Sequence, residues 1–230
     1  TAYFLNLTLK ITVPVVVAGA QRPITGLSSD APMNLVNAVR VAADPTSAGK
    51  GVLVVLNDEI HAARDVTKSS VLRLQAFQTP ELGALGHADP DKVALYRAPL
   101  RQHYPDTVFN VAGLTELPRV DIIESYAGAD GVCVSACVSA GAQGLVIATL
   151  APGTAPPEQT EAIVQAQQSG TSIAFATRAH GGRVASIPSQ QPAGVVLADN
   201  LSPQKARVLL MLALTHSKDP DFVQYAFSRY

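Results

Sequence analysis

Short apolar runs along the chain alternate with stretches whose apolar positions recur at helical spacing. Two of the runs, Pro14–Gly19 and Gly51–Leu56, are continuous and rich in β-branched residues, which is typical of strands buried on both faces of a parallel sheet. Between them, Asp30 can cap a helix and Pro32 suits its first turn. The apolar positions that predict this helix are Leu35, Val36, Val39 and Val41.

The second half of the chain shows a more regular alternation. Strands are predicted at Val120–Ile123, Gly144–Leu150, Thr171–Thr177 and Ala193–Ala198, and helices at Asp130–Ala140, Pro157–Gln168, Pro203–Thr215 and Asp219–Phe227. Strands that alternate with helices of this length form βαβ units, so we expect an α/β fold with mostly parallel sheets. Residues 82–117 hold glycines, prolines and histidines without sustained periodicity, which indicates a domain junction there.

Composition excludes several classes of protein. With 47% hydrophobic and 15% charged residues among 230, the chain can bury a large core, so a disordered or fibrous protein is not expected. The formal net charge of -1 gives no electrostatic reason to expect nucleic acid or an anionic membrane as a partner. No apolar run approaches the ~20 residues of a membrane helix, and the first residues do not resemble a secretion signal. The expected partner is a small molecule or another protein.

Cys133 and Cys137 are the only cysteines, four residues apart in a predicted helix. A disulfide at this spacing would be strained, so we expect both to be small buried apolar residues.

The segment Asn57–Ser70, which follows a predicted strand, is dense in ionisable and hydroxyl groups. Ligands of parallel sheets bind beyond the carboxyl ends of strands, and Lys68 there could assist proton transfer to or from a nucleophile. A loop lysine is more often simply solvated, and Arg64 with Asp65 could form only a surface ion pair. Ser28–Asp30 could hold a substrate, but a helix cap explains it more simply.

No cofactor motif is present in the sequence. The five histidines include no pair with metal-ligand spacing, and the glycine-rich phosphate and dinucleotide motifs are missing. We therefore predict neither a metal site nor an organic cofactor.

Several segments together resemble the bacterial type II L-asparaginases. They are Ala2–Thr8, Val17–Pro23, Ser29–Leu35, Gly51–Asp58 with Arg64–Lys68, and Asn200–Leu210 with Leu214–Pro220, in the order of that family. The resemblance implies the latter part of a flavodoxin-like large domain in residues 1–96, a linker in 97–118 and a smaller α/β C-terminal domain in 119–230. It also implies a homotetramer with active sites between subunits, and a periplasmic location, with the cytoplasm left open.

The implied activity is hydrolysis of L-asparagine, and to some extent L-glutamine, to the acid and ammonia. A threonine hydroxyl attacks the side-chain amide, helped by a second threonine, an aspartate and a lysine, without a metal or organic cofactor. Lys68 matches the family's catalytic lysine. Ala20 falls beside the pocket for the substrate amide, and Thr154 falls in the loop that reaches a neighbouring subunit's site.

The chain departs from the family pattern at three places. Both threonine motifs belong to the family's first third and are absent here, so we expect the native protein to carry residues before Thr1. Ala151–Thr154 replaces a frequent Gly-Asn-Gly-Asn loop, and Ala185–Ile187 stands where members carry a glutamate that senses the substrate's amino group. The alternatives are an inactive relative that serves as a binding or scaffold protein and an unrelated α/β domain that binds a small molecule.

Overall fold

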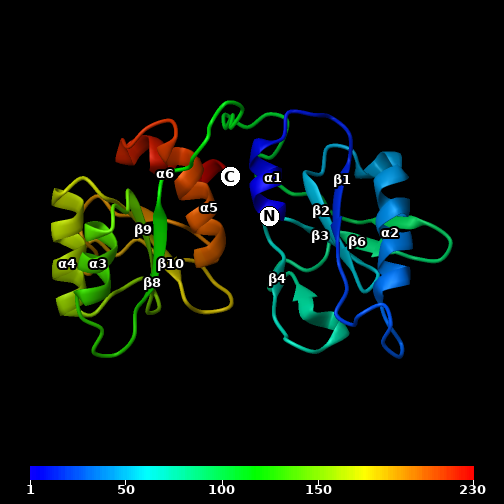
Figure 1. The fold of residues 1–230 in the computed structure, drawn as a ribbon, viewed down its shortest axis with the longest axis horizontal. Coiled ribbons are helices and arrows are strands. Elements are labelled where there is room, and N and C mark those ends of the chain that lie inside the picture. Colours follow the sequence, from blue (N-terminus) through cyan, green and yellow to red (C-terminus); the bar gives the residue numbers. More distant parts are fainter. The chain divides into compact units, whose positions relative to one another are not determined.

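The computed structural model describes residues 1–230, which form two compact units, Thr1–Asn110 and Val111–Tyr230. Figure 1 shows the helices and strands of each unit. The first unit contains α1 (Ala2–Thr8), β1 (Val15–Ala18), α2 (Ala31–Ala43), a 3-10 turn (Pro45–Ser47), β2 (Val52–Leu56), β3 (Glu59–Ala62), β4 (Thr67–Lys68), a second 3-10 turn (Leu74–Ala76), β5 (Phe77–Gln78), β6 (Gly86–Ala88) and β7 (Val93–Leu95). None of the helices is long and apolar enough to cross a membrane.

The sheet of the first unit has the strand order β1-β2-β3-β6-β7. Strands β1 and β2 pair in parallel, with Val15 opposite Val52, as their β-branched sequences predict. Every residue of β2 is buried, whereas β1 is half-buried with Ala18 exposed. The sequence predicts a strand buried on both faces, whereas within residues 1–230 β1 is only partly buried and pairs with β2 alone.

The polar region after β2 contains a strand that the sequence pattern did not reveal. Asn57 and Asp58 both adopt positive φ and form a two-residue turn, which returns the chain as β3. A turn this short allows only antiparallel pairing, and β6 and β7 are antiparallel as well. The α/β class is confirmed, but this sheet is mixed, and most of its pairings are antiparallel.

Helix α2 buries polar side chains and exposes apolar ones. Asn34 and Asn37 are buried, while Leu35 is 64% exposed and Val39 is 62% exposed. Among the four apolar positions that predicted the helix, only Val41 is buried. The helix begins where Asp30 and Pro32 predict it, but its inward face serves hydrogen bonding as much as apolar packing.

The second unit matches the predicted elements one by one. It contains β8 (Val120–Glu124), α3 (Val132–Ser139), β9 (Gly144–Thr149), α4 (Pro157–Gln168), β10 (Ser172–Thr177), β11 (Val196–Leu197), α5 (Pro203–Leu214) and α6 (Pro220–Arg229). Its sheet has the order β11-β10-β9-β8, and every pairing is parallel. The prediction of βαβ units is confirmed here.

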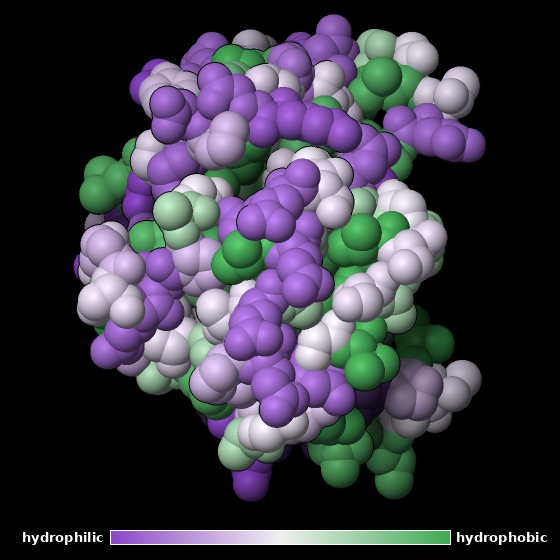
Figure 2. Space-filling model, turned by 90° about the vertical axis from the view of Figure 1, so that its left-hand side faces the viewer, coloured by the Kyte–Doolittle hydropathy of each residue, from purple (hydrophilic) through white to green (hydrophobic).

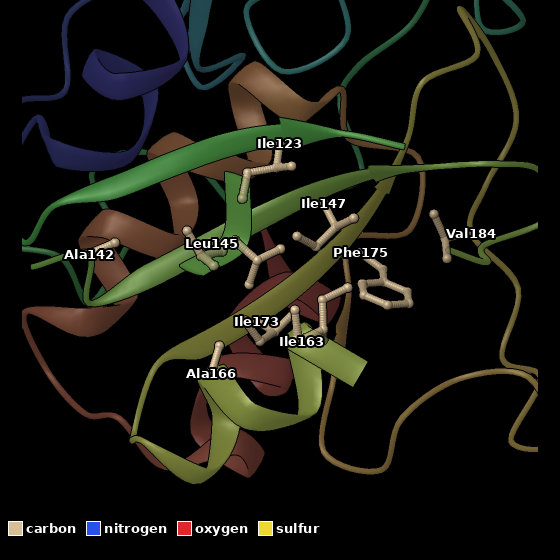
Figure 3. Close-up of a cluster of buried hydrophobic side chains, with 11 residues drawn as sticks. Ile123, Ala142, Leu145, Ile147, Ile163, Ala166, Ile173, Phe175 and Val184 are labelled. Atoms are coloured by element: carbon tan, nitrogen blue, oxygen red, sulfur yellow. The ribbon is translucent and has the colours of Figure 1, made fainter. Parts of the chain in front are cut away.

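One hydrophobic core of the second unit lies between its sheet and helices α3 and α4. Ile147 of β9, Phe175 of β10 and Ile163 of α4 are fully buried and belong to one cluster (Figure 3). Burying side chains of this size stabilises the fold by about 1.5–3 kcal/mol each. The alternating strands and helices of the sequence thus meet in a continuous apolar layer.

Of the two cysteines of α3, only Cys137 packs against that layer. Cys133 is exposed and Cys137 is half-buried, and both are free thiols. The expectation that both are buried apolar residues is wrong, because Cys133 is exposed and Cys137 is only partly buried. Figure 2 views the molecule from the side that carries α3 and α4, and a band of hydrophilic residues crosses this face.

Candidate active site

Lys68 lies in the short hairpin formed by β4 and β5 of the first unit. It is not at the end of the buried strand β2, since β3 and a turn intervene between them. The side chain is exposed, but its Nζ donates a hydrogen bond of 2.8 Å to Oε1 of Gln21. The same ammonium lies 5.4 Å from the ring centre of Phe77, close enough for cation–π attraction. Lys68 therefore contacts the loop that follows β1.

The loop after β1 carries Ala20, directly before Gln21. Two of its backbone N–H groups, those of Gln21 and Arg22, hold it to the start of α2, because each donates a 2.9 Å hydrogen bond to the carboxylate of Asp30. Nδ2 of Asn34, within α2, donates a third bond of 2.9 Å to the same carboxylate. Asp30 is the N-cap residue, yet its side chain makes no cap hydrogen bond. Asp30 thus occupies the predicted cap position, but its carboxylate binds the preceding loop and Asn34 instead of capping the helix.

These hydrogen bonds affect the ionisation of Asp30. Its partial burial raises the pKa, but the hydrogen bonds from Gln21, Arg22 and Asn34 outweigh that effect and lower the pKa below its ordinary value. Asp30 is thus a carboxylate at neutral pH.

Asn34 joins two loops at the carboxyl ends of β1 and β2. Its Nδ2 also donates to the backbone oxygen of Gly19 at 2.9 Å, and its Oδ1 accepts from the backbone N–H of Asn57 at 2.9 Å. The side chain is buried, so these bonds are shielded from water. The rule that places ligands beyond parallel strand ends predicts this neighbourhood, and the structure brings the loop of Ala20 and Lys68 together there.

Arg64 and Asp65 precede β4 and form an ion pair with a 3.1 Å separation between Nη1 and Oδ1. Their side chains are only 6% and 14% exposed, so the interpretation as a surface pair is wrong. The chain reverses just after β3, which turns both side chains inward. Tyr3 of α1 lies near enough for both charges to affect its pKa, which is raised chiefly by burial.

A buried histidine lies elsewhere in the same sheet. His61 of β3 has its Nδ1 at 2.9 Å from Oγ1 of Thr79 and its Nε2 at 3.3 Å from a carboxylate oxygen of Glu59. Burial lowers the pKa of His61, although the charge of Glu59 acts in the opposite direction. No three or more histidine, cysteine or acidic side chains are arranged to hold a metal ion.

Thr154 belongs to the second unit, in the loop that follows β9. Its backbone pairs with Leu150, and its side chain is half-buried. Nε2 of Gln191 donates to the backbone oxygens of Gly153 at 2.9 Å and of Ala185 at 2.8 Å. Gln191 therefore joins the loop of Thr154 to the segment Ala185–Ile187, where the resemblance had placed a glutamate.

Sequence reasoning missed Gln21, Asn34 and Gln191. The spacing of Asp30 and Asn34, four residues apart at the start of a helix, was the one available signal that these side chains could meet. Nothing in the sequence shows which partners a loop glutamine selects.

The fold and this site define an α/β protein with a lysine amine held by a glutamine side chain beside the loop that follows β1. A family model described as "Asparaginase, N-terminal" matches residues 1–101, and "Glutaminase/Asparaginase C-terminal domain" matches residues 119–227. The chain belongs to the asparaginase family, as its sequence motifs predicted.

Individual relatives agree with this assignment. The chain is 42% identical to "L-asparaginase 2" of Escherichia coli and 36% identical to "Glutaminase-asparaginase" of Pseudomonas fluorescens, over 100% of its own length. It spans 67% and 64% of those proteins, about two thirds of their length. A crystal structure titled as a probable cytoplasmic L-asparaginase of Campylobacter jejuni is 40% identical with a TM-score of 0.97, covering 100% of this chain and 75% of that one.

Proposed function

We propose that this chain is part of an amidohydrolase that hydrolyses L-asparagine, and also L-glutamine, to the acid and ammonia. The observation that carries the proposal is the Lys68 amine held beside the loop of Ala20. The names of the relatives, which include asparaginases and glutaminase-asparaginases, support the same substrate class.

In this proposal Lys68 is a catalytic residue that stabilises charge on an attacking threonine hydroxyl and assists its proton transfer. The threonine comes from the part of the protein outside this chain. The backbone around Ala20 borders the pocket for the side-chain amide. Asp30 and Asn34 keep that backbone in place through the hydrogen bonds described above.

Lys68→Met in the full-length protein tests the catalytic assignment. Met keeps most of the side-chain length without the amine, so we expect kcat for ammonia release from asparagine to fall by about 10²–10⁴-fold. Lys92→Met, at an exposed turn of the same unit, is the matched control. Unchanged turnover in Lys68→Met would remove Lys68 from the mechanism.

The alternative is a relative that binds a ligand without turning it over. The segment Ala185–Ile187 favours it, since it offers no carboxylate for an α-amino group. Ammonia release from asparagine, glutamine and simple amides separates the two functions, because binding measured by calorimetry without ammonia release supports the alternative only.

We also propose a homotetramer in which Thr154 reaches a neighbouring subunit's site, with domains at 1–96 and 119–230 and a linker at 97–118. Mixing Lys68→Met subunits with Thr154→Ala subunits, each expected to be inactive alone, tests whether active sites are shared. Mixed tetramers regain intact active sites only if two subunits build each one.

A periplasmic location is proposed from the Haemophilus influenzae relative named "Probable L-asparaginase periplasmic", which is 42% identical. Cell fractionation tests it against the cytoplasm.

A further inference from the structure

The side-chain amide of Gln21 is hydrogen-bonded at both of its ends. Its Oε1 accepts from Nζ of Lys68 at 2.8 Å, and its Nε2 donates to the backbone oxygens of Val71 at 3.2 Å and Arg73 at 3.0 Å. Turning the amide over would place its NH2 group against an ammonium and its oxygen against two carbonyls. The surrounding groups therefore fix the orientation of this amide.

The backbone of Gln21 is fixed as well. Its N–H donates to the carboxylate of Asp30, so the residue is held at its main chain and at its side chain. From this position it reaches two separate parts of the β4–β5 hairpin: the amine of Lys68 and the exposed backbone of 71–73.

Lysine has a long flexible side chain, and an exposed one samples many rotamers unless it is held. Here Phe77 provides an aromatic face and Gln21 provides the hydrogen-bond acceptor. Because the amine must meet a reacting group at hydrogen-bond distance, its placement determines how often it is in a productive position.

We propose that Gln21 is a positioning residue for Lys68, which fixes the lysine amine relative to the loop of Ala20 and to the segment 71–73. This inference rests on the proposed function for its effect on turnover. The contact itself does not depend on that function, so a chemical measurement can test it separately.

The chemical test measures acylation of Lys68 by limiting amounts of an amine-reactive ester in the full-length protein, by peptide mass spectrometry. Labelling of Lys92 in the same sample is the internal reference. In Gln21→Met, which removes the acceptor at similar length, we expect the Lys68 to Lys92 ratio to rise roughly threefold. In Gln21→Glu, a carboxylate beside the ammonium should lower the ratio. A ratio that is the same in wild type and both variants would overturn the contact.

The kinetic test uses Gln21→Met, Lys68→Met and the double variant. A positioning role predicts a roughly tenfold lower kcat for asparagine in Gln21→Met with KM changed less than twofold. It also predicts no further loss when Gln21→Met is added to Lys68→Met, because Gln21 acts through the lysine. An equal loss in both backgrounds would show that Gln21 acts independently of Lys68 and would overturn the proposal.

Gln168→Met, at the exposed end of α4, is the matched control for a glutamine replacement. Should Gln21→Met fail to fold, Gln21→Asn keeps the amide but is one methylene too short to reach Lys68. If no variant and no wild type releases ammonia while the labelling ratio changes as expected, the proposed function fails and the Gln21–Lys68 contact stands. If wild type is active and Gln21→Met retains full kcat, the positioning role fails and the proposed function stands.

Discussion

Replacing Asp30 with Asn tests whether this carboxylate holds the loop of Ala20. The substitution keeps the shape of the side chain, removes its charge and turns one acceptor oxygen into an NH2 donor. Three N–H groups, from Gln21, Arg22 and Asn34, converge on the two oxygens at 2.9 Å each. A single amide oxygen accepts two of them, so at least one donor is left facing the new NH2 group.

The expected cost follows from those bonds. Hydrogen bonds to charged groups contribute about 1.5–3 kcal/mol each. Because Asp30 is only partly buried, water replaces some of what is lost, and we expect the free energy of unfolding to fall by about 1–3 kcal/mol. For a unit of this size that corresponds to a melting temperature lower by roughly 4–12 °C.

The assay is denaturant unfolding of wild type and Asp30→Asn at pH 7 and pH 3. The pKa of Asp30 is lowered from 3.8 in the folded protein, so its contribution is fully present above that value and is lost as pH falls through the folded pKa. The gap between the two proteins should therefore shrink at pH 3. Asp91→Asn, at an exposed carboxylate, is the control. A gap of equal size at both pH values, or none at pH 7, would refute the reasoning.

Three further predictions concern other parts of the chain. Burial lowers the pKa of His61 below 6.5, so the folded protein favours the neutral form. The free energy of unfolding, measured by urea titration, should therefore fall as the pH is lowered from 8 to 5.5, and should fall less in His61→Gln. Gly153→Ala should lower the melting temperature more than Gly141→Ala, because a Cβ at Gly153 meets a side-chain carbon at 2.6 Å and one at Gly141 meets nothing within 4 Å. Cys133 should react with maleimide before Cys137 by peptide mapping, because Cys137 is less exposed and burial, with Asp121, raises its thiol pKa.

The second unit could be predicted almost entirely from the sequence. Each of its strands is a short apolar run bounded by polar or glycine residues, and each long helix begins near a proline, so pattern and structure agree. In the first unit the β2–β3 turn was missed, because Asn57 and Asp58 belong to a polar stretch that reads as a loop. The apolar positions predict helix α2, but three of the four, Leu35, Val36 and Val39, are exposed and only Val41 faces the core.

The candidate site could also be predicted only in part. The neighbourhood of Ala20 and Lys68 follows from the rule on strand ends together with the family resemblance. The contacts of Gln21 and the buried state of Arg64 depend on how loops bend after the strands end, and residue spacing does not encode that bend. Side-chain partners within loops are therefore the part of the site that only the structure supplies.

Asn34 gives the strand-end loops a shared anchor with a practical consequence for protein engineering. The same amide bonds Gly19, Asp30 and Asn57, so the segments after β1 and β2 are not independent modules. A graft that exchanges one of these segments for that of another family member must transfer a compatible residue at position 34 as well. Otherwise the exchanged loop would lack the hydrogen bonds from residue 34 that fix its conformation.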